Sequence, residues 1–443
     1  MRSRRRINWQ KIFNFSSFVF LLSCCLWFGG RFIYFYLQNH KSEEVKDNSV
    51  TLSSLIIKNE NNNSNFKLIK DSYYFTNDSS SNYVSYSNIS FRIFKIKNNK
   101  IYLISENNLT GLAYGDMVDD YSKSYIYKWL NKDSDDEYSG IFENSLNNTD
   151  KYLEKYDVCI DKVDDATKVT CNDVYSNANV GLLSITDYAN TGGKNSFINN
   201  SQYTYLSNRT TENEVWFIND EGKLNTSNGS DIYGVKPVIV LNKDVKSVSG
   251  NGTKESPYVI DEENGYFGSY VNLDNDIWRI YEEDDDNVKL MLNDYLKVND
   301  ENLSYIYSNN NYFHNDTAYG SLAYYLNRTY LNSLSYKDII LESKYSNGVY
   351  DISYDYSNIL EKTVDTKVSV MSIGNIILNN YDNIWTNTGS SSKNSNVYVL
   401  RGNMNISSKG VNNEAFVVPC ITISKSNLTK GNGSYDDPYM MVK

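Results

Sequence analysis

Apolar and polar residues alternate with a period of two at two places in the chain. Residues 89–104 alternate on both sides of a polar turn at 97–100, and residues 277–292 repeat this pattern around an acidic turn at 282–287. Alternation of this kind predicts strands that bury one face, and a short polar turn between two such strands predicts a β-hairpin. The sequence therefore predicts two similar hairpins, far apart in the chain.

Each predicted hairpin is followed by a stretch with helical spacing. Residues 124–131 carry apolar side chains one turn apart, and residues 321–327 are their counterpart. Second helices are expected around 138–153 and 331–341. Short apolar runs then predict the remaining strands, at 180–185, 215–218 and 223–224 in one case and at 368–373 and 397–400 in the other. This order, strands then helices then short strands, is typical of an α+β fold.

A proline-bearing strand and a glycine-rich turn close each unit. The strands are residues 234–241 and 416–423, and the turns that follow are residues 250–258 and 431–439. All four prolines of the chain occupy these matched positions: Pro237 corresponds to Pro419 and Pro257 to Pro438, and the two separations agree to one residue. A repeat of this length indicates duplicated modules, which we assign to residues 72–262 and 263–443.

The N-terminal region has the pattern of a membrane anchor. Residues 1–11 are basic, and nineteen uncharged residues follow from Ile12 to Gly30. A membrane helix needs about 20 apolar residues, and basic residues beside it stay cytoplasmic. We therefore predict a cytoplasmic tail at 1–11, an uncleaved transmembrane signal anchor at 12–37 and a polar stalk at 38–71. The rest of this single-pass cell-membrane protein is expected to be extracellular.

A lipoprotein is the alternative form of anchor. Residues 21–24 loosely resemble a bacterial lipobox, in which Cys24 would become the lipidated N-terminus. The apolar run continues past Cys25, which favours the uncleaved helix.

Charge separates the anchor region from the rest of the chain. Residues 1–48 hold eight of the 43 basic and three of the 54 acidic residues, a net charge of +5. The remainder then has 35 basic and 51 acidic residues, a net charge of −16. A surface this acidic repels phosphate backbones, so we expect no nucleic-acid partner.

Short motifs resemble those of an uncharacterised domain family of bacterial surface proteins. The family's usual pattern is Trp-Arg-Val, Trp-Leu-Asn, Leu-Leu-Ser, Trp-Leu-Arg-Ser and Gly-Val-Arg-Pro. The matching segments, spread over residues 72–443, are Ile277-Trp278-Arg279-Ile280, Trp129-Leu130-Asn131, Gly181-Leu182-Leu183-Ser184, Tyr205-Leu206-Ser207 and Gly234-Val235-Lys236-Pro237. Phe91 replaces the Trp in the first module, Lys236 replaces the Arg, and Pro419 lacks the preceding Gly and Arg.

The same layout is similar to that of C-type-lectin-like domains. The resemblance implies two tandem C-type-lectin-like modules, each with antiparallel short strands and two helices. Domains of that kind can bind calcium through acidic and amide side chains, and calcium is the cofactor that the resemblance allows.

Candidate chemistry is sparse. The chain has two histidines, and His314 has no nucleophile signature around it, so we expect no catalytic residues. Asp133, Asp135 and Glu137 alternate as calcium ligands can, but the loop lacks the Gly and Glu that an EF-hand requires. They are therefore weak metal candidates beside the alternative of a solvated acidic loop, and no other cofactor is expected.

Aromatic residues are the other candidates for ligand contacts. Trp385 and Tyr205 precede the last hairpin of each module, and we expect them to be exposed and able to stack on sugar rings. Trp216 and Trp278 lie within strands and are expected in the core. Arg92 and Arg279 occupy corresponding positions of the two predicted hairpins, and their expected role is a structural ion pair.

The cysteines bear on the same extracellular assignment. Cys159 and Cys171 flank a short loop, and outside the cytoplasm they are expected to form a disulfide. Cys420 replaces an apolar residue of the first module and is expected to be a buried thiol.

These patterns together favour a non-catalytic binding or adhesion protein of a bacterial surface, with a glycan or another surface protein as its ligand. A carbohydrate-active enzyme would need two carboxylates facing each other across a cleft. A passive surface spacer would lack any exposed aromatic cluster. The sequence leaves both alternatives open.

Overall fold

The structure is a computed structural model in which residues 50–443 form one compact unit. It describes residues 50–115, 121–131, 141, 145–168, 170–211, 214–260, 265–310, 313, 319–350, 362–390 and 395–441. Within these residues no helix is long and apolar enough to cross a membrane. The predicted tail at 1–11 and anchor at 12–37 lie outside the described residues. Below, residues 50–260 are the first half and residues 265–441 the second half.

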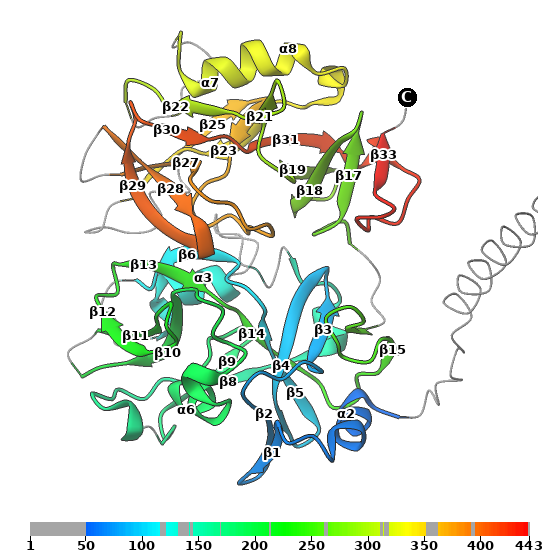
Figure 1. The fold of residues 1–443 in the computed structure, drawn as a ribbon, viewed down its shortest axis with the longest axis vertical. Coiled ribbons are helices and arrows are strands. Elements are labelled where there is room, and N and C mark those ends of the chain that lie inside the picture. The colour runs from blue at the N-terminus through cyan, green and yellow to red at the C-terminus, as the bar shows by residue number, and fades with distance from the viewer. Residues whose placement is uncertain are drawn as a thin grey trace, which may run out of the picture. The chain divides into compact units, whose positions relative to one another are not determined.

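The first half is built on a large sheet in which a hairpin occupies the centre (Figure 1). Its strand order is β15-β16-β3-β4-β5-β14-β7, and β2 pairs with β4 and with β1. The bounds of these strands are β1 (Phe66–Ile69), β2 (Ser72–Phe75), β3 (Tyr83–Tyr86), β4 (Ile89–Lys97), β5 (Lys100–Ser105), β7 (Leu153–Glu154), β14 (Val238–Leu241), β15 (Ser247–Ser249) and β16 (Tyr258–Ile260).

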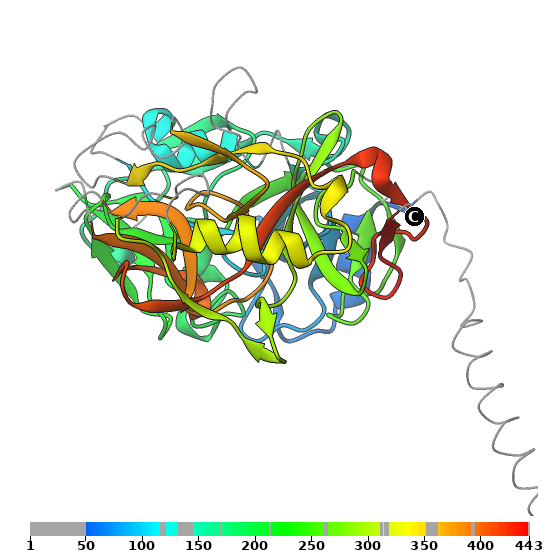
Figure 2. The same ribbon diagram turned by 90° about the horizontal axis from the view of Figure 1, so that it is seen from above.

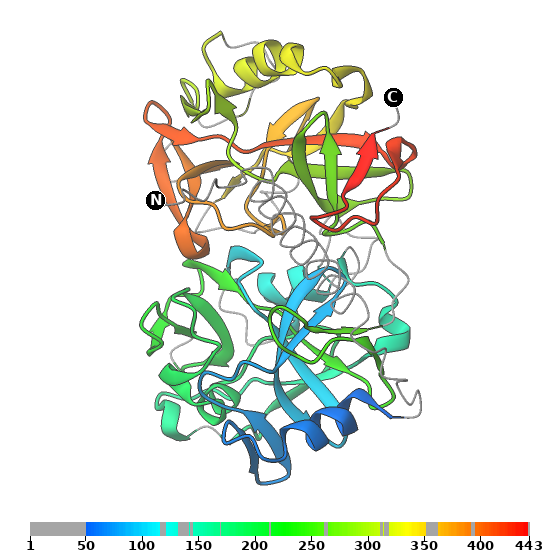
Figure 3. The ribbon, with the colours of Figure 1, turned by 45° about the vertical axis from the view of Figure 1, so that its right-hand side comes forward.

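The large sheet of the second half repeats this order. It runs β26-β31-β19-β18-β17-β33-β32, so that β17, β18, β19, β31 and β33 take the places of β3, β4, β5, β14 and β16. Figure 3 shows the red β33 beside the green β17, which it pairs with in parallel. The strands are β17 (Tyr270–Leu273), β18 (Asp276–Glu283), β19 (Asn287–Leu292), β26 (Val368–Val370), β31 (Pro419–Ser424), β32 (Leu428–Thr429) and β33 (Tyr439–Met441).

The two sheets match residue by residue. Tyr83 pairs with Arg92 and Tyr270 with Arg279, so the two arginines that correspond in the sequence also have equivalent partners in the sheets. Register shifts also recur, between Ile93 and Lys95 and at the equivalent place in β18. The hairpin spacing in the sequence therefore predicted the centre of both sheets.

The glycine-rich turn that ends each half docks on the first strand of its sheet. Tyr83 N–H donates to Gly252 O at 2.7 Å, and Tyr270 N–H donates to Gly433 O at 2.8 Å. Gly252 and Gly433 have φ values of +86° and +78°, which side-chain-bearing residues rarely adopt. The backbone conformation at these two matched positions therefore requires glycine.

A second sheet in each half also repeats. The first runs β12-β11-β10-β13-β6 and the second β29-β28-β27-β30-β22, with β24 beside β27. The strands are β6 (Thr110–Ala113), β10 (Thr204–Arg209), β11 (Val215–Ile218), β12 (Leu224–Ser227), β13 (Ile232–Val235), β22 (Ser304–Ile306), β24 (Val349–Tyr350), β27 (Ile384–Ser390), β28 (Asn396–Arg401), β29 (Asn405–Gly410) and β30 (Glu414–Phe416).

The remaining elements are short. Two-stranded sheets join β8 (Tyr156–Cys159) with β9 (Val174–Ala178), β20 (Lys297–Val298) with β21 (Glu301–Asn302), and β23 (Ser343–Ser346) with β25 (Thr363–Thr366). The 3₁₀ turns are η1 (Tyr121–Lys123), η2 (Ala166–Lys168), η3 (Gly193–Asn195), η5 (Lys337–Ile339), η6 (Gly402–Met404) and η7 (Lys425–Asn427).

The helices correct the expected fold class. They are α2 (Leu52–Glu60), α3 (Tyr125–Asn131), α5 (Thr149–Tyr152), α6 (Ile185–Asn190) and a continuous segment made of α7 (Leu322–Tyr324), η4 (Tyr325–Tyr330, a π-helix) and α8 (Leu331–Ser333), yellow in Figure 2. Among the described residues strands dominate, so the α+β prediction of two C-type-lectin-like modules with two helices each is wrong. Helical apolar spacing lasts only about two turns in residues 124–131, which is enough for the short helix α3.

The described part of the predicted stalk at 38–71 folds with the first half. Ser54 N–H donates to the Thr51 side chain, which caps α2, and Leu52 and Ile56 of this helix are fully buried. The apolar residues of this polar region therefore form the buried side of a helix in the first core. Residues 38–49 and the predicted module boundary at 262/263 lie outside the described residues.

The two halves bond to each other within this unit. Trp129 Nε1–H donates to Gly374 O at 2.8 Å, and Ile377 N–H donates to Leu109 O at 2.7 Å. The core of the first half also includes Tyr350 and Tyr398 of the second half. The duplicated parts are therefore packed together, and the core of one is completed by the other.

Candidate functional site

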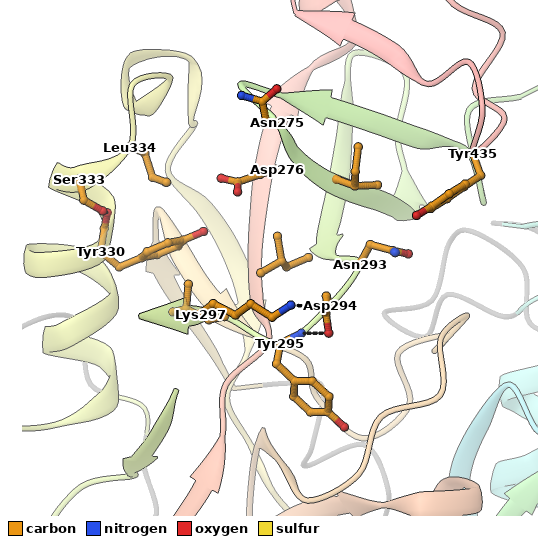
Figure 4. A pocket seen from close by; sticks show the side chains of 13 residues that line it. Asn275, Asp276, Asn293, Asp294, Tyr295, Lys297, Tyr330, Ser333, Leu334 and Tyr435 are labelled. Atoms are coloured by element: carbon orange, nitrogen blue, oxygen red, sulfur yellow. Dashed lines mark hydrogen bonds and ion pairs between the residues drawn. The ribbon is translucent and has the colours of Figure 1, made fainter. Parts of the chain in front are cut away.

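A cavity of about 520 Å³ opens in the second half, between segments that are far apart in the sequence. The β17–β18 turn supplies Asn275 and Asp276, and the stretch after β19 supplies Asn293 to Lys297. The helical segment adds Tyr330 and Ser333, and the closing glycine-rich turn adds Tyr435. Figure 4 shows these side chains around one shared space.

The β17–β18 turn fixes the first carboxylate. Asp274 and Asn275 both have positive φ, 53° and 77°, the conformation of the tight hairpin turns that Asn and Asp tolerate. Asp276 follows directly, and its Oδ2 accepts a hydrogen bond of 2.6 Å from the Tyr336 hydroxyl. Burial raises the pKa of Tyr336, so this hydroxyl remains a donor to the carboxylate.

The second carboxylate is held in an ion pair. Lys297 Nζ lies 2.7 Å from Asp294 Oδ2, and the Tyr295 N–H donates to Asp294 Oδ1 at 2.8 Å. The Lys297 hydrogen bond lowers the pKa of Asp294, and Asp294 in turn raises the pKa of Lys297. Both side chains are about half exposed (58% for Asp294 and 50% for Lys297), so their charges remain available to a ligand.

The floor of the cavity is apolar, and one exposed aromatic ring stands at its edge. Leu292, Leu296 and Leu334 line the floor and are largely buried. Tyr330 is buried beside them, whereas Tyr435 is 62% exposed. A large exposed aromatic side chain beside a polar cavity is a common contact for ligands that have both apolar and polar faces.

This arrangement suits a neutral ligand that is rich in hydroxyl groups. The carboxylates of Asp276 and Asp294 accept hydrogen bonds, and the ammonium of Lys297 and the amides of Asn275 and Asn293 donate them. The Tyr435 ring can cover a flat apolar face. A strongly anionic ligand would meet two carboxylates and one ammonium group, so the cavity disfavours it.

The structure does not test the metal prediction. The weak candidates Asp133, Asp135 and Glu137 lie outside the described residues, as does His314. Among the residues that the structure does describe, no group of three or more His, Cys, Asp or Glu side chains comes close enough to hold an ion.

The aromatic ligand candidates are placed in the core, which corrects the prediction of exposure. Trp385 is 0% exposed and Tyr205 is 1% exposed. Trp385 Nε1–H donates to Tyr305 O at 2.7 Å, and the Tyr205 hydroxyl donates to Asp231 O at 2.5 Å. They occupy equivalent positions in β27 and β10, each of which has a neighbouring strand on both sides. Their polar atoms form hydrogen bonds within the protein. Neither side chain is presented to a ligand.

The cysteine predictions agree with the structure. Cys159 and Cys171 form a disulfide with 5.2 Å between their Cα atoms. Cys420 is a free, buried thiol, and burial raises its pKa. Trp278 and Trp216 are buried in strands, as expected.

The two matched arginines are structural, but their partners are not carboxylates. Arg92 donates to Asn82 Oδ1 at 2.8 Å and to the Tyr83 hydroxyl at 2.9 Å. Arg279 donates to Leu378 O at 2.9 Å and stacks over Tyr270. In the described part of the chain the expected ion pair is therefore replaced by hydrogen bonds to neutral oxygens.

The cavity residues were missed because they differ between the repeats. When the two hairpins are aligned on their matched arginines, Ile89 stands where the second half has Asp276, and Asn107 stands where it has Asp294. The signal available in the sequence was the change from uncharged residues in the first repeat to charged residues in the second, near the ends of matched strands. The contributions of Tyr330 and Tyr435 depend on how distant segments pack, which the sequence pattern does not show.

Comparison with family models, with curated proteins and with solved structures gives no match to this chain.

Proposed function

We propose that this chain is a membrane-anchored, extracellular binding or adhesion protein of a bacterial surface, and that its cavity binds a neutral glycan. The observation that carries the proposal is the cavity itself, with the carboxylates of Asp276 and Asp294, the ammonium of Lys297 and the exposed ring of Tyr435 around one space. Sugars combine hydroxyl groups on their edges with apolar ring faces, and both kinds of surface have partners here. The acidic character of residues 49–443 and the basic N-terminal residues support the extracellular placement.

Binding is a better proposal than hydrolysis. Glycoside hydrolysis requires one carboxyl group with a raised pKa to act as the acid beside a second, ionised carboxylate. Two carboxylates do line the cavity, which keeps a carbohydrate-active enzyme as the second candidate. The hydrogen bond from Lys297, however, lowers the pKa of Asp294 and keeps this carboxylate ionised. Asp294 therefore does not suit the role of the acid, which needs a raised pKa.

A glycan array tests the proposal directly. The full chain, purified in detergent, is applied to neutral and anionic glycans and to cell-wall fragments. We expect saturable binding to a neutral glycan that Tyr435→Ala and Asp294→Asn each weaken at least about tenfold, a loss of about 1.4 kcal/mol. Matched controls are Tyr319→Ala, an exposed tyrosine outside the cavity, and Asp244→Asn, an exposed aspartate paired with Lys243.

The outcomes separate the candidates. Binding that both cavity variants leave unchanged would contradict the proposed site. Release of shortened sugars from a bound oligosaccharide, lost in Asp276→Asn, would favour the enzyme. No binding to any glycan would contradict the glycan proposal and favour a protein ligand or a spacer.

A further inference from the structure

Lys236 is a buried lysine whose only partners in the described residues are neutral oxygens. It lies between β13 and β14 and is 1% exposed. Its Nζ is 2.7 Å from Ile198 O and 2.8 Å from Asn200 Oδ1. An ammonium group in such a place is costly unless a carboxylate neutralises it. Among the described residues Lys236 has no ion pair, and the nearby Glu106 pairs with Lys254 instead.

The surroundings make this amine a better nucleophile than an exposed lysine. Burial lowers the pKa of Lys236 to about 7; the negative charge of Glu106 opposes this effect and the positive charge of Arg92 adds to it. A substantial share of Lys236 is therefore neutral at physiological pH, whereas an ordinary lysine, with a pKa near 10.4, is almost fully protonated. Only the neutral amine has the electron pair that attacks a carbonyl carbon.

The facing carboxamide is held in a fixed orientation. Asn200 Nδ2 donates to Glu106 O at 3.0 Å and to Asn107 Oδ1 at 2.9 Å. These two bonds identify the amide nitrogen and turn the carbonyl end of the group toward Lys236. The amine and the carboxamide carbon are thus separated by one hydrogen-bond contact plus one C=O bond.

The second half shows what a purely structural solution looks like at the same place. Ile198 and Leu378 are equivalent. Ile198 lies six residues before Thr204 and Leu378 lies six residues before Ile384, and these two residues occupy the same position in their sheets. Leu378 O and Asn379 Oδ1 accept hydrogen bonds, both of 2.9 Å, from Arg279. A guanidinium group donates to these oxygens but stays protonated and does not attack amides.

We propose that the side chains of Lys236 and Asn200 condense into an intramolecular isopeptide bond. Lys236 Nζ attacks Asn200 Cγ, and a C–N bond forms between them. The Cγ–Nδ2 bond breaks, a proton passes from Nζ to the departing nitrogen, and ammonia leaves. No oxidant or second reactant is needed, and the product is a neutral secondary amide in place of a buried ammonium.

The cross-link would join two segments of the first half that are 36 positions apart in the chain. It ties the loop before β10 to the link between β13, in the second sheet, and β14, in the large sheet. A covalent bond at this junction would resist the pulling force expected on an anchored adhesion protein. This benefit rests on the proposed function, whereas the chemistry of the pair does not.

Intact-mass spectrometry of the full chain tests the proposal. After incubation at pH 8, the wild-type protein should be lighter than its sequence mass by one ammonia, beyond the two hydrogens lost to the disulfide. Peptide mapping should find the Lys236 peptide joined to the Asn200 peptide. Lys236→Arg keeps a cation that can donate to Ile198 O and Asn200 Oδ1 but does not attack amides, so this variant should fold and keep its full mass. Asn200→Ala should also keep its full mass.

Two results would overturn the proposal. One is a wild-type chain that retains its full mass after prolonged incubation at pH 8. The other is loss of ammonia without a joined peptide, which would show that Asn200 has cyclised onto the Ser201 backbone nitrogen and that Lys236 is only a hydrogen-bond donor. A glycan-binding result of either sign leaves both measurements unaffected.

Discussion

Asn131 and Asn327 make the same three hydrogen bonds in the two halves. Oδ1 of Asn131 accepts from Val180 N–H at 2.8 Å, and its Nδ2 donates to Val180 O at 2.8 Å and to Tyr127 O at 3.2 Å. Asn327 bonds Val368 N–H and Val368 O at 3.0 and 2.8 Å, and Ala323 O at 3.1 Å. One buried amide therefore joins a helix to the backbone of a residue more than 40 positions away, Val180 or Val368, in both repeats.

Replacing this amide should destabilise the protein. Asn131→Ala leaves the buried N–H and C=O of Val180 without partners, which costs about 1–3 kcal/mol of unfolding free energy. Asn327→Ala should cost a similar amount. Urea denaturation of the full chain in detergent measures both. The control is Asn332→Ala, whose exposed amide bonds Arg328 O of its own helix and whose loss should cost less than about 0.5 kcal/mol. Equal effects of the three substitutions would contradict the assignment.

Trp385→Ala should act on stability and not on ligand contact. The side chain is fully buried and bonds Tyr305 O, so truncation leaves a cavity and an unpaired carbonyl. We expect a loss of about 3–5 kcal/mol of unfolding free energy. Tyr435→Ala, which removes a ring that is 62% exposed, should change the melting temperature little. A Trp385→Ala protein with unchanged stability and lost glycan binding would restore Trp385 as a ligand residue.

The local parts of the fold were predictable because they depend on short-range pattern. The hairpins at 89–104 and 277–292 alternate with the period of a strand, and their acidic or amide turns mark where each chain reverses. The closing turns need glycine at Gly252 and Gly433, and the matched prolines placed the repeat to within one residue. These features are fixed by backbone geometry and by burial of one strand face.

The fold class and the site were not predictable in the same way. Residues 52–60 have a weak apolar pattern in a polar region, and only their packing against the first core shows that they form α2. The burial of Trp385 and Tyr205 depends on neighbours from both sides of a central strand. The cavity needs a turn, a helix and a closing segment to meet, and Asn275 and Tyr435 come from opposite ends of the second half.

Removing the disulfide should destabilise the first half. The bridge closes a loop between residues 12 positions apart, and in the chain-entropy model a loop of this size contributes about 3 kcal/mol. Cys159→Ala combined with Cys171→Ala should lower the urea midpoint accordingly, and reduction should have a matching effect on the wild type only. A double variant that is equally sensitive to reductant would mean that another bond is being reduced.

Cys420 should be inert in the folded protein. Its thiol is fully buried and burial raises its pKa, so at neutral pH it is neither accessible nor ionised. Alkylation by iodoacetamide at pH 8, followed by mass spectrometry, should leave Cys420 unmodified in native protein and modify it in urea. Rapid alkylation without urea would contradict the buried position in β31.

Asp294 should titrate below the ordinary range of an aspartate. The hydrogen bond from Lys297 lowers its pKa from 3.8, so the ion pair is complete above that value and is lost as the pH falls through the lower, folded pKa. Because both side chains are about half exposed, we expect a stability contribution below about 1 kcal/mol. Selective ¹³C labelling of aspartate and NMR titration of the side-chain carboxyl measure the pKa directly. Lys297→Met should move the titration of Asp294 toward higher pH, and Lys243→Met, which breaks the exposed pair with Asp244, should leave it unchanged. An Asp294 that titrates at its ordinary value in the wild type would show that the ion pair at the edge of the cavity does not persist in solution.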